Sequence, residues 1–264
     1  MILKRAREID AMIAAAEINR AALEALEPLI RPGATTAQLN EAAEDAIVSR
    51  GGTPAFKGYR GFPATLCTSL NEVVVHGIPN DKPLREGDVL SVDIGTFYKG
   101  YAADMAKTYP VGKIPASTQA LLQATEASLY AGIEAAQVGN RLGDVAAAIQ
   151  QVVEAAGFWV VREFVGHGIG SAFHEPPDVP NYGRAGTGPR LRPGLVLAIE
   201  PMVTERRTEV KILGDGWTAV TANGALAAHF EHTVAITEAG PRILTAKDAP
   251  LYSSQVLLGG NRGA

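Results

Sequence analysis

The sequence has one cysteine, few aromatic residues, and neither a long apolar run nor a block of like charges. Because Cys67 has no partner for an intramolecular disulfide, we expect a protein of a reducing compartment, the cytoplasm. No apolar run reaches about 18 residues and no signal-peptide pattern is present, which argues against a membrane partner. The net charge of −4 without a basic run argues against a nucleic-acid partner. A short basic cluster, Lys4, Arg5 and Arg7, is expected to be a solvated face.

The sequence does contain enough apolar residues for a large core, since 47% of its 264 residues are hydrophobic. A capping box at Thr35 and Gln38 should begin one helix, which Gly51 and Gly52 should stop. Helical spacing of apolar residues predicts further helices over 5–30, 117–136 and 141–156. Runs rich in β-branched residues predict strands over 65–75, 89–109, 159–165, 195–203 and 229–237.

A faint internal repeat suggests two similar halves. The stretch "LREGDVLSVDIG" (84–95) is similar to "LRPGLVLAIEPM" (191–202) at an offset of 107, and Asp93 aligns with Glu200. At an offset of 106, four apolar or glycine positions between 33 and 51 align with four between 139 and 157. Chance similarity between apolar segments is the alternative. If the repeat is real, two αβ halves pack about a pseudo-two-fold axis, with acids from both halves meeting at the axis and a mainly antiparallel sheet.

The stretch "SVDIGTFYKGYAADMAKTY" (91–109) reads as two strands joined by a tight turn at Lys99 and Gly100. Side chains alternate faces along a strand, so this turn would place Asp93 and Asp104 on the same face, opposite or diagonal to each other. Two unpaired carboxylates at this separation would repel, and one would retain its proton. A bound cation would remove the repulsion.

Three more candidate ligands follow: Glu200 after an apolar strand, Glu231 at the head of another, and His167 between glycines in "GHGIG". Four carboxylates and one imidazole suit two first-row divalent ions better than a structural zinc or a calcium ion. Each residue also has an ordinary reading. A single aspartate often bonds backbone groups, Glu200 or Glu231 could form an ion pair, and His167 could be a satisfied core histidine.

Five stretches together resemble one family. They are "PATLCTSLNEVVVHGIP" (63–79), "VDIGTFYKGYAADMAKTY" (92–109), "VGHGIGSAFHEPP" (165–177), "AIEPM" (198–202) and "FEHT" (230–233). In residue type and order they resemble the type I methionine aminopeptidases of bacteria, and the resemblance runs from about residue 5 to about 245.

The resemblance implies an α+β pita-bread fold with helices on its outer face. It implies one catalytic domain over 1–264, with halves at 12–110 and 117–240, and we expect the tail 248–264 to be loosely held. It also implies removal of the initiator methionine from nascent polypeptides, with a preference for a small second residue. The implied cofactor is two divalent ions per chain, from cobalt, manganese, iron, zinc or nickel. Small relatives are typically monomeric, and a transient ribosome contact is expected to use the folded surface.

The family's functional positions carry over residue by residue. Asp93 would bind one ion, His167 and Glu200 the other, and Asp104 and Glu231 would bridge them. Glu200 would also move a proton during catalysis. His76 and His174 would contact the substrate. The positions that correspond to the methionine pocket are Tyr59, Phe62, Cys67, Phe173 and Trp217, while Phe56 stands where some relatives have a smaller residue.

Four alternatives remain open at this point. A proline-directed peptidase of the same fold usually carries a large N-terminal domain, whereas the motifs here begin near residue 1. A type II methionine aminopeptidase has a long helical insertion in the second half, which the Pro- and Gly-rich stretch between His167 and Glu200 does not resemble. A binding protein with decayed ligands, or a metal-storage module, would not need all five ligands together with His76 and His174.

Overall fold

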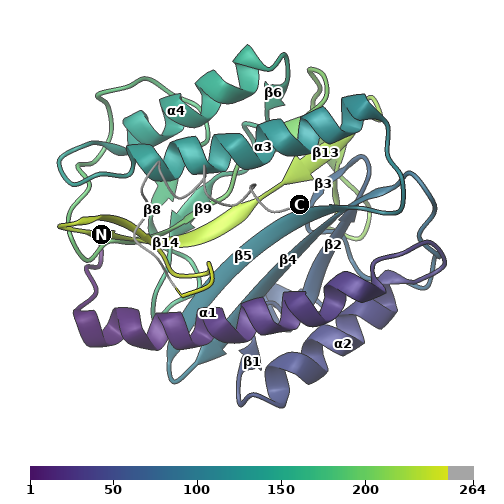
Figure 1. Ribbon diagram of the computed structural model, residues 1–264, viewed down its shortest axis with the longest axis horizontal. Helices are drawn as coiled ribbons and strands as arrows, with labels where there is room; N and C mark the ends of the chain where they lie inside the picture. Colours follow the sequence, from purple (N-terminus) through teal and green to yellow (C-terminus); the bar gives the residue numbers. More distant parts are fainter. Residues whose placement is uncertain (249–264) are drawn as a thin grey trace, which may run out of the picture.

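The computed structural model describes residues 1–248, which form an α+β fold (Figure 1). The helices are α1 (Ala6–Leu26), α2 (Thr36–Val48), α3 (Ala116–Ala135) and α4 (Leu142–Ala155). The strands are β1 (Thr53–Pro54), β2 (Leu66–Leu70), β3 (Val73–Val75), β4 (Val89–Tyr98), β5 (Tyr101–Pro110), β6 (Trp159–Val160), β7 (Gly166–Gly168), β8 (Glu175–Val179), β9 (Val196–Ile199), β10 (Met202–Thr204), β11 (Val210–Ile212), β12 (Ala219–Thr221), β13 (Ala227–His229), β14 (Glu231–Thr237) and β15 (Gly240–Ile243). Apart from Asp248, the tail predicted to be loosely held lies outside the described residues.

The central sheet has nine strands, and all of its pairings are antiparallel within residues 1–248. Its main path runs β1-β4-β5-β14-β9-β7-β8, with β2 added to β4 and β15 to β14. Two three-stranded sheets, β13-β10-β6 and β11-β12-β3, flank it. The mainly antiparallel sheet predicted from the sequence is confirmed.

The helices pack on one face of this sheet, α1 and α2 along β4 and β5, and α3 and α4 along the half that holds β9 and β14 (Figure 1). Leu90, Val92 and Ile94 of β4 lie in the core that the first helix pair covers. Because side chains alternate along a strand, Asp93 faces away from these helices. The helix layer therefore leaves the opposite face of the sheet for polar groups.

Equivalent contacts occur in the two halves. An isolated antiparallel bridge joins Thr35 to Pro83 before α2, and another joins Arg141 to Arg190 before α4. The offsets between these positions are 106 and 107, the same offsets found in the sequence repeat. The capping box of α2 is also present, since the Thr35 amide donates to Gln38 and the Gln38 amide donates to Thr35. These contacts agree with two similar halves, whose bounds at 12–110 and 117–240 remain a prediction.

Three predicted strands are each divided between two sheets, and the first of them, 65–75, forms β2 and β3. The segment 195–203 forms β9 and β10, which belong to different sheets and are separated by Glu200 and Pro201. Likewise 229–237 is divided between β13 and β14 at Phe230. Proline has no N–H for a sheet ladder, which accounts for the break at Pro201.

Two further predictions are corrected. The first helix ends at Leu26 rather than at residue 30, because Pro28 lies in a 3₁₀ turn, Glu27–Leu29, that replaces the last α-helical turn. Lys4 is buried in an ion pair with Glu175 instead of belonging to a solvated face. The partner lies 171 residues away in sequence, so no local pattern could reveal it.

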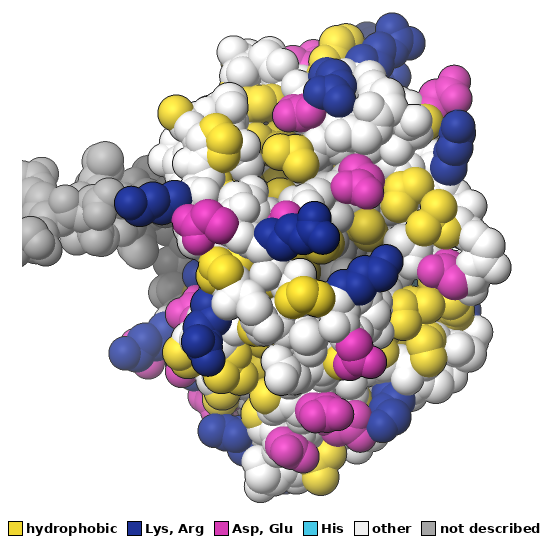
Figure 2. Space-filling view, turned by 90° about the vertical axis from the view of Figure 1, so that its right-hand side faces the viewer, with side chains coloured by type: hydrophobic (Ala, Val, Ile, Leu, Met, Phe, Trp, Pro, Cys, Tyr) yellow, Lys and Arg dark blue, Asp and Glu magenta, His cyan; other side chains and the backbone are white. Residues whose placement is uncertain are grey.

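On the face shown in Figure 2, basic and acidic side chains are interspersed rather than gathered by sign. This arrangement agrees with the small net charge of the chain. Within residues 1–248, none of the helices combines the length and the apolar character that a membrane span needs.

Candidate metal centre

The β4–β5 hairpin supplies two carboxylates to the face away from the helices. Lys99 and Gly100 form its turn with φ of 49° and 83°, and Tyr98 pairs with Tyr101, as the sequence predicts. In this register Asp93 lies opposite Ala106, which places it diagonally across from Asp104. Asp104 is buried.

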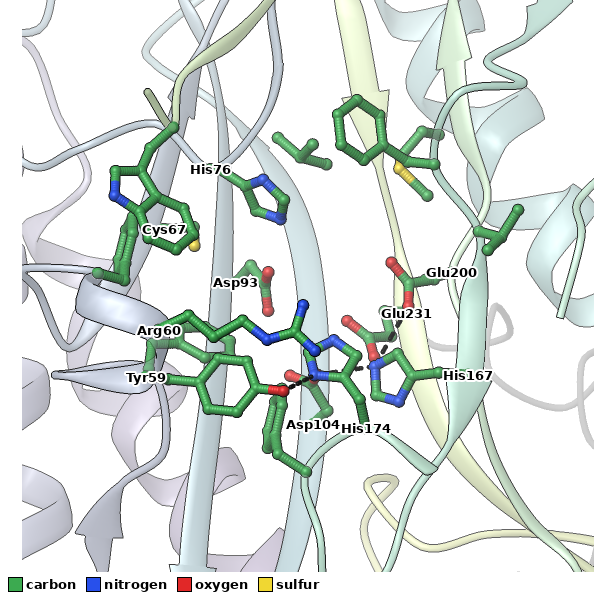
Figure 3. Close-up of a pocket in the computed structure, with 18 residues that line it drawn as sticks. Tyr59, Arg60, Cys67, His76, Asp93, Asp104, His167, His174, Glu200 and Glu231 are labelled. Atoms are coloured by element: carbon green, nitrogen blue, oxygen red, sulfur yellow. Dashed lines mark hydrogen bonds and ion pairs between the residues drawn. The ribbon is translucent and has the colours of Figure 1, made fainter. Parts of the chain in front are cut away.

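The second half of the chain supplies two carboxylates and an imidazole (Figure 3). Glu200 follows β9, Glu231 begins β14 next to it, and His167 lies in β7 on the other side of β9. The His167 Nε2 atom lies 3.7 Å from Asp104 Oδ2 and 3.6 Å from Glu200 Oε1. Ligand atoms of Asp104, His167 and Glu231 lie within 4.8 Å of one another. The structure therefore brings the five predicted ligands together, four from strands and Glu200 from the residue that follows β9.

This cluster carries more buried carboxyl oxygens than its surroundings satisfy. Asp93 Oδ1, Asp104 Oδ1 and Glu231 Oε1 are buried and have no hydrogen-bond partner among the described residues. Burial raises the pKa of Asp104 to about 8, and it also raises the pKa values of Asp93, Glu200 and Glu231 well above their ordinary range. Unpaired buried carboxyl oxygens of this kind fit a cation, and this oxygen-rich set with one imidazole suits first-row divalent ions.

The ordinary alternatives for two of these residues do not hold. His232 does not pair with Glu231; its Nδ1 atom contacts the Thr245 hydroxyl at 2.8 Å instead. His167 Nδ1 lies 2.9 Å from the carbonyl oxygen of Gly168, which leaves its Nε2 directed at the carboxylates. That the five residues bind metal remains a prediction.

The sequence reasoning missed His229, the last residue of β13. Its imidazole is buried, and its Nε2 atom lies 3.7 Å from Glu200 Oε2 with no hydrogen-bond partner. Ligand atoms of His229, Glu200 and Glu231 lie within 4.8 Å of one another. Burial lowers the pKa of His229 to about 3, so the ring is neutral. The available signal was its position two residues before Glu231, which strand alternation places on the same side.

The carboxylates form the floor of a cavity of about 200 Å³. All of the predicted catalytic, metal-ligating and pocket residues line it. Aromatic rings form its apolar wall, with Phe62 packing edge-on against Trp217 at 5.2 Å and Phe56 against Phe173 at 5.3 Å between ring centroids. Lining residues that were not predicted as site residues are Phe56, Arg60, Val75, Phe164, Val165 and Met202.

Two further histidines face the cavity from opposite sides of the cluster (Figure 3). His174 Nδ1 lies 2.9 Å from the Tyr59 hydroxyl, and the two rings stack at 5.3 Å. Burial and the nearby His167 lower the pKa of His174 to about 3. His76 has a positive φ of 60°, and burial also lowers its pKa. Both rings are therefore neutral, and His76 is held in a conformation that costs free energy in a non-glycine residue.

Cys67 lies beside Asp93, because the two residues are direct partners on β2 and β4. Burial and the four carboxylates raise the pKa of its thiol well above the ordinary value. The sulfur is therefore a neutral packing group in the cavity wall rather than a nucleophile.

Comparison with known proteins places this geometry in a family. The model of metallopeptidase family M24 matches residues 10–238. The chain belongs to metallopeptidase family M24. It is 52% identical to a methionine aminopeptidase of Clostridium perfringens, over 93% of this chain and 98% of that protein. It is 49% identical to methionine aminopeptidase 1 of Bacillus subtilis, over 93% of this chain and 99% of that protein.

Solved structures agree with this assignment. A methionine aminopeptidase from Rickettsia prowazekii matches with a TM-score of 0.92 and 37% identity, covering 93% of this chain and all of that one (100%). A prolidase from Pyrococcus furiosus shares the fold, with a TM-score of 0.75, but only 23% identity, and this chain covers 65% of it. The resemblance and the pita-bread α+β fold inferred from the sequence are thus confirmed.

Proposed function

We propose that this chain removes the N-terminal methionine from peptides and nascent polypeptides by hydrolysing the first peptide bond. The observation that carries the proposal is the convergence of four carboxylates, two buried and two largely buried, and one imidazole on the floor of an aromatic-walled cavity. Membership of a metallopeptidase family supports it, as does about 50% identity to proteins named methionine aminopeptidase.

The centre would hold two divalent ions from among cobalt, manganese, iron, zinc and nickel. Asp93 would hold one ion, and His167 and Glu200 would hold the other. Asp104 and Glu231 would be shared, which agrees with the interactions of Asp104 with both the Asp93 and the Glu231 carboxyls. When bound, the ions supply a water molecule whose pKa is lowered toward neutrality.

The cavity orients the substrate by chemistry at its two ends. The α-amine lies at the Asp93 end, because an amine nitrogen can bind the ion that Asp93 would hold, which selects for a free N-terminus. Cys67, the neighbour of Asp93, begins the apolar wall that Phe62, Phe173 and Trp217 continue. A flexible thioether packs well against sulfur and aromatic edges, so this wall selects methionine.

Three residues act on the scissile bond. Glu200, at the edge of the cluster, takes the proton of the attacking water and passes it to the leaving amide nitrogen. The Tyr59 hydroxyl donates a hydrogen bond to His174 Nδ1, so the neutral ring carries its proton on Nε2. This N–H donates a hydrogen bond to the substrate carbonyl oxygen as negative charge develops there. His76 holds the amide in line from the opposite wall.

The physiological substrates are nascent polypeptides with a small second residue. We propose that the chain works as a monomer in the cytoplasm, with transient contact to the ribosome through its folded surface. The interspersed charges in Figure 2 agree with a transient contact rather than a strong electrostatic one.

The test compares two peptides on the metal-loaded protein. We expect release of free methionine from Met-Ala-Ser and no hydrolysis of Ala-Pro, which a proline-directed member of the family would cleave. Hydrolysis of Ala-Pro in preference to Met-Ala-Ser would contradict the proposal.

A further inference from the structure

The residues before α1 contribute a buried charge to the structure. The Lys4 amide donates to the carbonyl oxygen of Gly194 at 2.6 Å, which fixes this segment against the second half of the chain. The Lys4 ammonium pairs with the Glu175 carboxylate, and only 4% and 2% of the two side chains are exposed. It also donates to the carbonyl oxygen of Ile2 at 3.2 Å. Lys4 is therefore fixed at both its backbone and its side chain.

Two glycines make the space that Lys4 occupies. A Cβ atom at Gly170 would lie 2.2 Å from Lys4 Cε, and a Cβ atom at Gly194 would lie 2.6 Å from the Lys4 carbonyl oxygen. Both distances are far inside van der Waals contact, so a side chain at either position would displace Lys4. The ion pair is thus built into the fold from three separate segments.

Glu175 closes the loop between β7 and β8, which carries Phe173 and His174 into the cavity. Its Oε1 atom accepts the Ala172 amide at 3.3 Å, and its backbone pairs with Gly168. The carbonyl oxygen of Gly170 accepts the Ala102 amide at 2.8 Å, so the first half of the chain also holds the loop. Glu175 is the residue next to His174, and its carboxylate is oriented by Lys4.

We propose that the Lys4–Glu175 ion pair is the positioning element that sets the His174 imidazole against the substrate carbonyl. Within residues 1–248 the His174 side chain makes one hydrogen bond, to the Tyr59 hydroxyl, so the position of its ring also depends on how its backbone is held. Glu175 provides this support only while its own charge is paired, because an unpaired buried carboxylate would move toward water. Lys4 is a positioning residue that acts through Glu175. This inference rests on the proposed function.

The test is a double-mutant cycle that measures how far the effect of the ion pair on kcat depends on His174. The double variant Lys4→Met with Glu175→Met removes both charges and leaves no unpaired one. We expect kcat for Met-Ala-Ser to fall about tenfold or more, with KM changed less than about threefold, because a displacement of about 1 Å of a group that contacts the reacting atoms has a large rate effect. In a His174→Ala background the same two changes should alter kcat less than about twofold, since the group they position is absent.

Two controls separate this role from a general loss of structure. The exposed ion pair Lys107–Glu27, removed as Lys107→Met with Glu27→Met, should leave kcat unchanged. If the Met pair does not fold, Lys4→Gln with Glu175→Gln replaces it in the cycle.

Equal losses of kcat in the wild-type and His174→Ala backgrounds would overturn the inference, as would wild-type kcat in a folded Met or Gln pair. Failure of the wild-type protein to release methionine would instead overturn the proposed function, so the two failures are distinguishable.

Discussion

The two carboxylate oxygens of Glu200 face two different imidazoles. Oε1 lies 3.6 Å from His167 Nε2, and Oε2 lies 3.7 Å from His229 Nε2. His167 belongs to the predicted ligand set, whereas His229 extends the cluster on the far side of Glu200. One oxygen is thus available to an ion, and the other faces the imidazole of a residue outside the predicted ligand set, which can orient the carboxylate.

Replacing His229 tests this arrangement. His229→Leu should lower kcat for Met-Ala-Ser about tenfold or more while the bound-metal content stays the same, because loss of the imidazole that faces Glu200 Oε2 leaves this carboxylate free to move. His229→Gln, which keeps an N–H donor, should recover most of the loss. The matched control is His232→Gln, since His232 faces Thr245 rather than the cavity and should affect stability but not kcat. Wild-type kcat in His229→Leu would exclude the role.

Glu200→Gln should abolish most turnover without unfolding the protein. Gln has nearly the same shape but is not a base, so we expect kcat to fall about 10²- to 10⁴-fold. Circular dichroism and metal analysis report whether fold and loading are retained. Near-normal turnover with metal bound would remove Glu200 from proton transfer.

The stability of the metal-free protein should fall as pH rises from 6.5 to 8. In the unfolded chain the carboxyls ionise near their ordinary pKa values of 3.8 and 4.5, whereas burial raises the folded-state pKa of Asp104 to about 8. Over this range the folded state binds more protons than the unfolded state, so its free energy of unfolding decreases with pH. His229 and His232 have lowered pKa values, about 3 and about 4, so their contribution is lost only below about pH 6.5.

Thermal unfolding of chelator-treated protein at pH 6.5 and pH 8, with and without manganese, measures this effect. Because a cation favours the ionised carboxylates, the stabilisation by manganese should be larger at pH 8. A metal-free protein that is at least as stable at pH 8 as at pH 6.5 would contradict the account of the cluster.

Gly95→Ala should weaken methionine binding. A Cβ atom at Gly95 would lie 2.7 Å from the Phe173 ring and 2.9 Å from the Phe56 ring, so the added methyl must push the aromatic wall into the cavity. We expect KM for Met-Ala-Ser to rise about tenfold with metal content unchanged, in line with the cost of one misplaced methyl group in an apolar pocket. Gly214→Ala is the matched control, because nothing lies within 4 Å of its Cβ position. A KM equal to that of the control would show that the wall has room to adjust.

Local patterns predicted the parts of the site that depend on local geometry. Alternation and a two-residue turn are sufficient to place Asp93 and Asp104 on one face, and the structure agrees. The capping box at Thr35 and Gln38 is equally local.

Features that depend on the assembled fold could not be predicted in this way. Glu200 and Glu231 were predicted as ligands, but the change of sheet beside each of them was not. The apolar pattern continues across each change, so the sequence reads as one strand. His229 differs from an ordinary core histidine by the Glu200 carboxylate it faces, and its position two residues before Glu231 is its one signal in the sequence. Lys4 gives no local signal, since its partner Glu175 is brought to it by tertiary packing alone.

The most direct test of the central claim is metal removal followed by titration, with methionine release from Met-Ala-Ser as the readout. We expect no measurable release from the chelated protein and recovery of activity as a divalent ion is added, complete at two equivalents per chain. Undiminished release by the metal-free protein would contradict the account.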